Sequence, residues 1–323
     1  MTDARARLSS LAKPPGSLGR LEDLAAQLCD IARTCPPPPP RPVTVAVFAG
    51  DHGVLAQGVS PWPQEITASM VRTFTLGGAA VNVLARQVGA DVVVVDVGIA
   101  SPVDGAIDRN VRRATADLSI GPAMSLDEAK QAFDVGRDVA RDATAGLLVT
   151  GDMGIGNTTP SAAIICALTA GDAATVTGRG TGIDDDTLAL KTRIVADAAA
   201  RVAGADAMTV LAEVGGLEIA AIAGFVTEAA TRRIPVVVDG VIALAGLLVA
   251  ATLDPAVLEC VIAGHRSTEP GASAVLEHLG LEPLLDLGMR LGEGTGALLA
   301  VPIIQSAAAL ITEMATIAEV LDR

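Results

Sequence analysis

The stretch GLLVTGDMGIGNTTPSAAIICALTA, residues 146–170, decides the fold that we expect for this chain. A short run rich in leucine and valine ends at a glycine-rich turn, and an alanine-rich stretch follows the turn. A short β-branched run followed by a helix is typical of a βα unit, whose strand lies in a parallel sheet. The turn then lies at the carboxyl end of the strand, where such sheets bind their ligands.

The same pattern recurs along the chain. Four further apolar runs end in glycine together with aspartate or histidine, and helical stretches lie between them. These runs are VTVAVFAGDHG (43–53), ADVVVVDVG (90–98), IPVVVDG (234–240) and LECVIAGHR (258–266). We therefore predict an α/β protein with a Rossmann-like, mostly parallel sheet flanked by helices.

The regions on either side of these runs suggest the domain organisation. The segment CPPPPPRP (35–42) is typical of a stiff connector. Residues 1–40 are expected to form an N-terminal helical part, residues 41–290 the large domain, and residues 291–323 a C-terminal helical segment. The two terminal parts would together form a smaller helical domain.

The composition excludes several classes of partner. The formal net charge is −14 and no long basic run exists, so nucleic acid is not an expected partner. The most apolar run, 241–253, is shorter than a membrane-spanning helix, and residues 1–20 lack the apolar core of a signal peptide. We expect a cytoplasmic protein that binds no membrane. Its cysteines form no CxxC pair and are expected to be reduced, although Cys29 and Cys35 are close enough to leave a disulfide open.

Two glycine clusters are candidates for a phosphate site. In the first, glycines let the backbone approach a ligand and the following residues open a helix, whose N-terminus favours an anion. Its candidate residues are Gly154, Ile155, Gly156, Asn157 and Thr158. In the second, TGRGTGIDD (177–185), they are Gly178, Arg179 and Gly180. An ordinary strand-to-helix turn would explain the first cluster equally well.

Other charged residues have ordinary explanations beside functional ones. The aspartates 184–186 are expected at a helix N-terminus, where carboxylates are favourable, rather than at a metal. Lys191 lies further along that helix and points either back toward the site or into water. Asp51 and His52 resemble an acid–base pair, but a single histidine is more often structural. Ser267 lies in AGHRSTEPGA (263–272), which is either a phosphate or ribose site or a capped turn.

The stretch LGMRLGEGTGALLA (287–300) holds one glutamate, Glu293, among glycines. A glutamate in such a turn is more often a solvated surface residue than a catalyst. The sequence has no P-loop, no G-x-S-x-G and no H-E-x-x-H, and AGDHGV stands where a dinucleotide-binding G-x-G-x-x-G would follow the first strand.

Seven segments carry a resemblance that covers nearly the full chain. In order, they are KPPGSLGRLE (13–22), AGDHGV…GVSPWPQEIT, LGGAAVNVLAR (76–86), GDMGIGNTT, TGRGTGIDD, GHRSTEPGA and MRLGEGTGA. Together they resemble the nicotinate-nucleotide–dimethylbenzimidazole phosphoribosyltransferases. No single segment is specific, but seven in register are.

The resemblance implies a homodimer that converts nicotinate mononucleotide and 5,6-dimethylbenzimidazole into α-ribazole 5′-phosphate and nicotinate, without metal or organic cofactor. It implies that Glu293 is the general base and that the two glycine clusters hold the phosphate. Gln64, Leu291 and Gly292 are then expected beside the benzimidazole. Asp152, where many members carry glutamate, is one methylene shorter, so an auxiliary catalytic role for it, or for Lys191, stays open.

The residues agree with this chemistry. The nicotinate nitrogen is quaternary, so nicotinate leaves without a proton and a single carboxylate base is sufficient. Closure of the site would raise the pKa of that base toward the working pH. We expect the glycines beside Glu293 to leave room for the ribose and two aromatic rings. Two alternatives remain: a nicotinamide-dinucleotide-dependent dehydrogenase and a non-catalytic nucleotide-binding protein.

Overall fold

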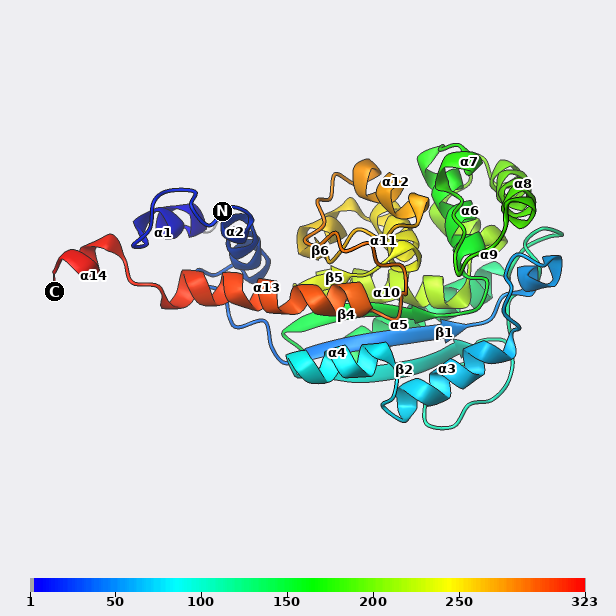
Figure 1. The fold of residues 1–323 in the computed structure, drawn as a ribbon, viewed down its shortest axis with the longest axis horizontal. Helices are drawn as coiled ribbons and strands as arrows, with labels where there is room; N and C mark the ends of the chain where they lie inside the picture. The colour runs from blue at the N-terminus through cyan, green and yellow to red at the C-terminus, as the bar shows by residue number, and fades with distance from the viewer. Residues whose placement is uncertain (1–2, 323) are drawn as a thin grey trace.

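A computed structural model describes residues 3–322, and its centre is a six-stranded parallel sheet (Figure 1). The strands are β1 (Val43–Gly50), β2 (Ala90–Gly98), β3 (Ile107–Asp108), β4 (Leu147–Met153), β5 (Val236–Val238) and β6 (Val261–Ala263). All five runs expected as strands are confirmed, and all pairs are parallel. β3 is not predicted by the sequence, because an exposed edge strand of two residues has no apolar pattern.

Helices connect the strands and cover the sheet. They are α1 (Ala4–Ser10), α2 (Arg20–Ala32), α3 (Glu65–Thr75), α4 (Ala80–Val88), α5 (Leu126–Asp142), α6 (Thr158–Thr169), α7 (Ala173–Val176), α8 (Asp185–Arg201), α9 (Ala207–Val214), α10 (Leu217–Thr231), α11 (Val241–Leu253), α12 (Pro270–His278), α13 (Thr295–Glu313) and α14 (Ile317–Leu321), with 3₁₀ turns η1 (Gly53–Gln57) and η2 (Pro255–Cys260). The apolar run 241–253 is the buried core helix α11.

The sheet order, β3-β2-β1-β4-β5-β6, places the site. After β1 the chain adds β2 and β3 toward one edge of the sheet. It then crosses to β4 on the other side of β1 and adds β5 and β6 toward the opposite edge. In such doubly wound sheets the connections leave β1 and its neighbour in opposite directions, so a crevice opens at their carboxyl ends. The residues that follow β1 and β4 therefore meet at one place, although they are far apart in the chain.

Each face of the sheet carries its own apolar core. Along β1, Ala46 and Phe48 belong to the core shared with α5, α10 and α11, whereas Val45 and Val47 belong to the core shared with α3, α4 and α13. This alternation follows from the two-residue period of a strand. Both faces are covered, so the central strands are mostly apolar, as expected for a buried parallel sheet.

The pair α5 and α10 packs unusually closely on one face. A Cβ added at Gly136 of α5 would overlap the carbonyl oxygen of Ala221, and one at Gly224 of α10 would overlap that of Phe133. The two backbones approach this closely only because both contact positions lack a side chain. The position of α10 therefore depends on these two glycines.

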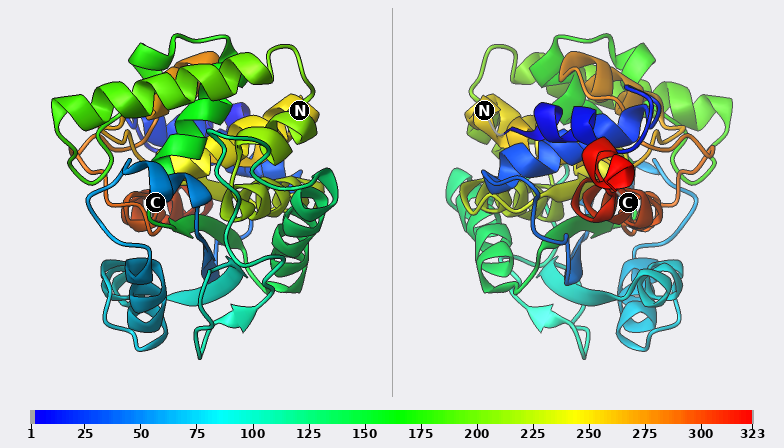
Figure 2. Two further views of the ribbon diagram at one scale, coloured as in Figure 1. Left: turned by 90° about the vertical axis from the view of Figure 1, so that its right-hand side faces the viewer. Right: turned by 90° about the vertical axis from the view of Figure 1, so that its left-hand side faces the viewer.

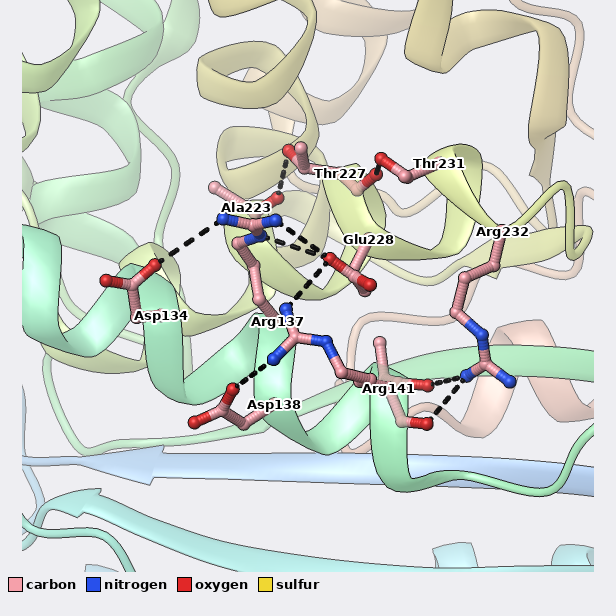
Figure 3. A network of polar contacts seen from close by, with 10 residues as sticks. Asp134, Arg137, Asp138, Arg141, Ala223, Thr227, Glu228, Thr231 and Arg232 are labelled. Carbon is pink, nitrogen blue, oxygen red and sulfur yellow. Dashed lines mark hydrogen bonds and ion pairs between the residues drawn. The ribbon is translucent and has the colours of Figure 1, made fainter.

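A network of ion pairs around the buried Glu228 joins the same two helices (Figure 3). Glu228 of α10 accepts hydrogen bonds from Arg137 Nε at 3.1 Å and Arg141 Nη2 at 3.3 Å, both on α5. Asp134 and Asp138 hold the same two arginines from the outer side. Burial acts to raise the pKa of Glu228, but the two guanidinium groups outweigh it and lower the pKa below its ordinary value. Each charge thus has a partner, which a buried carboxylate requires.

The two ends of the chain pack together (Figure 2). Arg7 Nε donates to the carbonyl of Ile311 at 2.6 Å, and Leu11 forms an isolated antiparallel bridge with Thr316. Helix α13 is long and apolar enough to cross a membrane by length and composition. It contributes to the core beneath the sheet, however, with Leu298, Val301 and other residues fully buried. That the two terminal parts form a separate, smaller domain stays a prediction.

Candidate active site

A cavity of 490 Å³ opens at the carboxyl ends of the strands. Its lining comes from the α3 region, the segment after β4, the turns before α11 and α12, and the segment before α13. The lining residues are Trp62, Ile66, Met70, Asp152, Met153, Gly154, Ile155, Asn157, Thr158, Gly180, Thr181, Gly240, Val241, Ile242, His265, Ser267, Glu269, Arg290, Leu291, Gly292 and Glu293. A hollow of 40 Å³ adjoins it and is lined by Gly156 and Arg179 together with several of the same residues.

Most of the candidate residues from the sequence therefore lie together. Gly178 and Lys191 lie directly behind the lining, since Lys191 Nζ donates to the carbonyl of Gly178 at 3.0 Å and to Thr158 Oγ1 at 2.7 Å. Gln64 precedes α3 and caps it through its carbonyl, which accepts from the N–H of Thr67. It does not line the cavity.

Glu293 has a buried side chain rather than the solvated one that a glycine turn suggests. Its φ of 63° is in the left-handed region, which is unfavourable for a residue with a side chain. Gly292 and Gly294 on either side also have positive φ. The Oε2 atom is 3.4 Å from the backbone nitrogen of Val81 in α4. Burial raises the pKa of Glu293; the Val81 N–H opposes this and the charge of Asp239 adds to it.

Two of the glycines around Glu293 lack a side chain because neighbouring protein atoms leave no space for one. A Cβ at Gly294 would lie 3.0 Å from the Thr150 carbonyl, and one at Gly296 would overlap the ring of His265. Only Gly292 of these glycines faces the cavity. The expectation that these glycines mainly leave room for aromatic rings is therefore wrong for Gly294 and Gly296, which let the segment pack against β4 and His265.

Asp239, which the sequence analysis did not select, anchors the segment that carries Glu293. Its carboxylate accepts from the N–H of Gly294 at 3.1 Å and of Ala297 at 2.9 Å, so it caps α13. His265 Nε2 lies 3.4 Å from the same carboxylate. A carboxylate at a helix N-terminus is favourable. The backbone that directly follows the glutamate is therefore held by the residue after β5.

Asp152 is buried at the end of β4 and lines the cavity. Its Oδ2 atom accepts from Asn157 Nδ2 at 3.1 Å, while its Oδ1 atom has no hydrogen-bond partner among residues 3–322. Burial raises the pKa of Asp152 well above its ordinary value, and the charges of Asp239 and Glu218 act in the same direction. The side chain is thus favoured in its neutral, protonated form.

The first glycine cluster forms a turn that leads into α6. Asn157 occupies the N-cap position, but its side chain bonds Asp152 rather than the backbone of the helix. The N–H groups of Gly156 and Thr158 have no partner within the described part of the chain. Thr67 Oγ1 accepts from the N–H of Ile155 at 3.1 Å and holds the turn. Two free N–H groups at a helix N-terminus are suited to an anion.

The second cluster lies beside the first and is held by charged side chains. The N–H of Gly180 donates to Glu269 Oε1 at 2.9 Å, and its carbonyl accepts from Arg290 Nη1 at 2.6 Å. Arg290 brings a cation to the cavity rim. Burial lowers the pKa of Lys191 to about 8, against the charge of Glu269, which raises it. Arg179 pairs with Asp185 instead of pointing into the larger cavity.

Apolar side chains make up another part of the cavity lining. This part contains Trp62, Ile66, Met70, Ile242 and Leu291. Trp62 is 50% exposed and Leu291 is 58% exposed, so both lie at the mouth. An apolar wall together with a few placed polar groups is typical of a small-molecule site, and this one has room for a planar ring.

His52 does not reach the cavity. Its ring is buried behind the turn at Gly154 and faces Glu218 of α10, which lies far from it in the sequence. The helical pattern around Glu218 gave no sign of a functional residue. Only the presence of a charge inside an otherwise apolar helix could have indicated one.

The arrangement favours one kind of chemistry. A carboxylate of raised pKa, apolar side chains and a helix N-terminus with free N–H groups line one cavity, so the site can take a proton from an apolar ring held beside a phosphorylated ligand. No group of three metal-ligating side chains is found among residues 3–322. Asp184 caps α8 by accepting from the N–H of Thr187, which confirms the structural explanation of this aspartate.

Comparison with known proteins identifies close relatives. A family model described as Phosphoribosyltransferase matches residues 1–320. The nicotinate-nucleotide–dimethylbenzimidazole phosphoribosyltransferase of Salinispora tropica is 52% identical over 95% of this chain and 91% of its own. That of Chloroflexus aurantiacus is 51% identical over 98% and 93%. The crystal structure of CobT from Thermus thermophilus superposes with a TM-score of 0.96 at 45% identity, covering 98% of this chain and 97% of that one.

Proposed function

Because the chain belongs to the nicotinate-nucleotide–dimethylbenzimidazole phosphoribosyltransferase family, we propose that its cavity holds both substrates and that Glu293 is the general base. The enzyme transfers the phosphoribosyl group of nicotinate mononucleotide to 5,6-dimethylbenzimidazole. The products are α-ribazole 5′-phosphate and nicotinate. Neither the dehydrogenase nor the non-catalytic alternative is favoured by these relatives.

The two glycine clusters provide the place for the 5′-phosphate. The free N–H groups of Gly156 and Thr158 support an anion there, and Arg290 adds a cation at the rim. Lys191 ties the two clusters together from behind through Thr158 and Gly178. The ribose then lies near Ser267, between the cradle and Glu293.

The apolar wall provides the place for the benzimidazole. Ile66, Met70, Leu291 and Gly292 all line the cavity and are available to contact the ring. Gln64 lies just before Ile66 in the chain and does not reach the lining, so it would contact the ring only after a movement of this segment.

The reaction then needs one proton transfer. Glu293 takes the proton from one imidazole nitrogen, and the other nitrogen attacks C1′ from the face opposite the nicotinate. The C1′–N bond to nicotinate breaks and its electron pair returns to the pyridine nitrogen, so nicotinate leaves without a proton. The linkage changes from β to α. The net reaction releases one proton, which Glu293 passes to solvent.

One observation carries this assignment. Glu293 is a buried carboxylate on the cavity wall with a single hydrogen-bond donor, Val81, found among the described residues. Burial raises the pKa of this carboxyl toward the range in which a base works best at neutral pH. Asp152 also lines the cavity, but burial and the charges of Asp239 and Glu218 favour its protonated form, in which it cannot accept a proton.

The direct test mixes the protein with nicotinate mononucleotide and 5,6-dimethylbenzimidazole and measures free nicotinate and α-ribazole 5′-phosphate. We expect both products in equal amounts. Binding of both ligands without nicotinate release would contradict the transferase. Protection from heat by NAD but not by nicotinate mononucleotide would support the dehydrogenase instead. The homodimer and the cytoplasmic location stay predictions, and light scattering on the purified protein tests the first.

A further inference from the structure

A buried charged pair lies behind the cavity and takes no part in the reaction described above. His52 Nε2 is 2.9 Å from Glu218 Oε1, and both side chains are fully buried. His52 follows β1, and Glu218 lies in the first turn of α10. Neither lines the cavity.

The backbone closes tightly around this pair. A Cβ at Gly216 would lie 2.6 Å from His52 Cε1, and one at Gly50 would lie 3.0 Å from Glu218 Oε2. At Gly154 a Cβ would overlap the carbonyl oxygen of Gly50 and lie 3.1 Å from His52 Nε2. Gly154 lines both the cavity and the smaller hollow. One side of this turn thus faces the ligand space, and the other side packs against the pair.

The charges around the pair favour its ionised form. Burial, the largest single effect, acts to lower the pKa of His52, but the charge and close contact of Glu218 together with the charge of Asp51 outweigh it, and the pKa is raised. Asp51 stands on the same segment, Glu218 on α10, and Asp152 at the end of β4. An imidazolium with a carboxylate is the arrangement that these neighbours support.

A purely structural role accounts poorly for such a pair. The free-energy cost of removing two charges from water offsets much of their mutual attraction, so a buried ion pair contributes little to stability. The best-attested role of such a pair is to hold the surrounding structure in one specific conformation. Here it lies against the turn that begins the phosphate cradle. We infer that His52 and Glu218 are positioning residues, which hold the Gly154 turn in place for the phosphate and ribose of nicotinate mononucleotide. This inference rests on the proposed function.

The test uses Glu218→Gln, which keeps the shape of the side chain and removes its charge. Calorimetry on the full-length protein measures the Kd of nicotinate mononucleotide without the second substrate, and separately the Kd of 5,6-dimethylbenzimidazole. We expect the Kd of nicotinate mononucleotide to rise about tenfold to a hundredfold, because small misplacements of a binding group have effects of this size. The Kd of dimethylbenzimidazole should not change, since its wall is formed by other elements.

Glu228→Gln is the matched control. Glu228 is a buried, ion-paired glutamate on the same helix α10, but its partners Arg137 and Arg141 lie on α5 (Figure 3). Both variants are expected to lower the melting temperature. Only Glu218→Gln should weaken nicotinate mononucleotide binding. Equal changes in the two variants, or unchanged binding in Glu218→Gln, would overturn the inference.

Two further variants keep the outcome decisive. If Glu218→Gln does not fold, His52→Gln replaces it in the same measurements, with the same expected result. Gly154→Ala tests the proposed function itself: unchanged nicotinate mononucleotide binding in that variant removes the cradle from the account. Weak binding in Gly154→Ala together with normal binding in the Glu218 and His52 variants removes only the positioning pair.

Discussion

The Oε2 atom of Glu293 lies 3.4 Å from the backbone nitrogen of Val81, near the start of α4. This contact joins the segment before α13 to the helix that precedes β2. Within residues 3–322, the Val81 N–H is the hydrogen-bond donor of this carboxylate. A helix N-terminus favours the charged form of Glu293, while burial favours the neutral form, and burial prevails. Glu293 can therefore act as a base, and its pKa is raised above the ordinary value of a glutamate.

The first prediction concerns pH. Protonated Glu293 cannot accept a proton, so kcat/KM for dimethylbenzimidazole should fall as pH drops through the pKa of this group in the free enzyme. Because that pKa is raised, the fall should begin above the value of about 4.3 that is usual for an exposed glutamate. A pH profile measured at constant ionic strength checks this. A profile that is flat down to the ordinary carboxyl range would contradict the assignment.

The second prediction separates Asp152 from Glu293. Asp152 is already favoured in its protonated form, so Asp152→Asn replaces one neutral hydrogen-bonding group by another. We expect turnover within about tenfold of the wild type, well short of the hundredfold or more that removal of a general base costs. Steady-state kinetics at saturating substrates measures it. A loss as large as that of a Glu293 variant would make Asp152 a catalytic base.

The third prediction concerns Lys191, whose pKa is lowered to about 8. Above that pH the side chain loses its charge, so the affinity for nicotinate mononucleotide should fall as pH rises through about 8. Lys191→Met should weaken binding about tenfold, the size of one charged hydrogen bond, and abolish this pH dependence. Calorimetry between neutral and alkaline pH checks both. If the variant keeps the alkaline fall, another group causes it.

The fourth prediction concerns stability. The Cβ of Gly136→Ala would overlap the Ala221 carbonyl, so α5 and α10 must separate, at a cost of about 3 kcal/mol in free energy of unfolding. Gly121→Ala is the matched control, because a Cβ there meets nothing within 4 Å. Denaturant unfolding of both variants measures the difference. Similar stabilities would show that the interlocking glycines matter little.

The fold was largely readable from the sequence, because each buried parallel strand is an apolar run that ends in a glycine turn. The strand order was not readable, since no local pattern records which strands pair. Gly154 and Gly180, which line the cavity, were selected because glycine clusters are local signals. Asp239 and Glu218 were missed for the opposite reason: each acts on a residue brought near it only by the fold.

The burial of Glu293 was also not predictable from its local sequence. Its glycine-rich surroundings indicated an exposed turn, whereas the left-handed φ at Gly292 and Gly294 turns the segment inward and buries the carboxylate. Burial of this side chain depends on α4 and β5, which lie far away in the chain. The resemblance to a family, rather than the local pattern, selected it correctly as a cavity residue.

Nicotinate release by Glu293→Gln, compared with release by the wild type in the presence of both substrates, decides whether Glu293 is the base. We expect the variant to fold, to bind nicotinate mononucleotide with normal affinity and to lose about a hundredfold to ten-thousandfold in turnover, the range for removal of a general base. Near-normal nicotinate release by Glu293→Gln would contradict the role of Glu293 as the base.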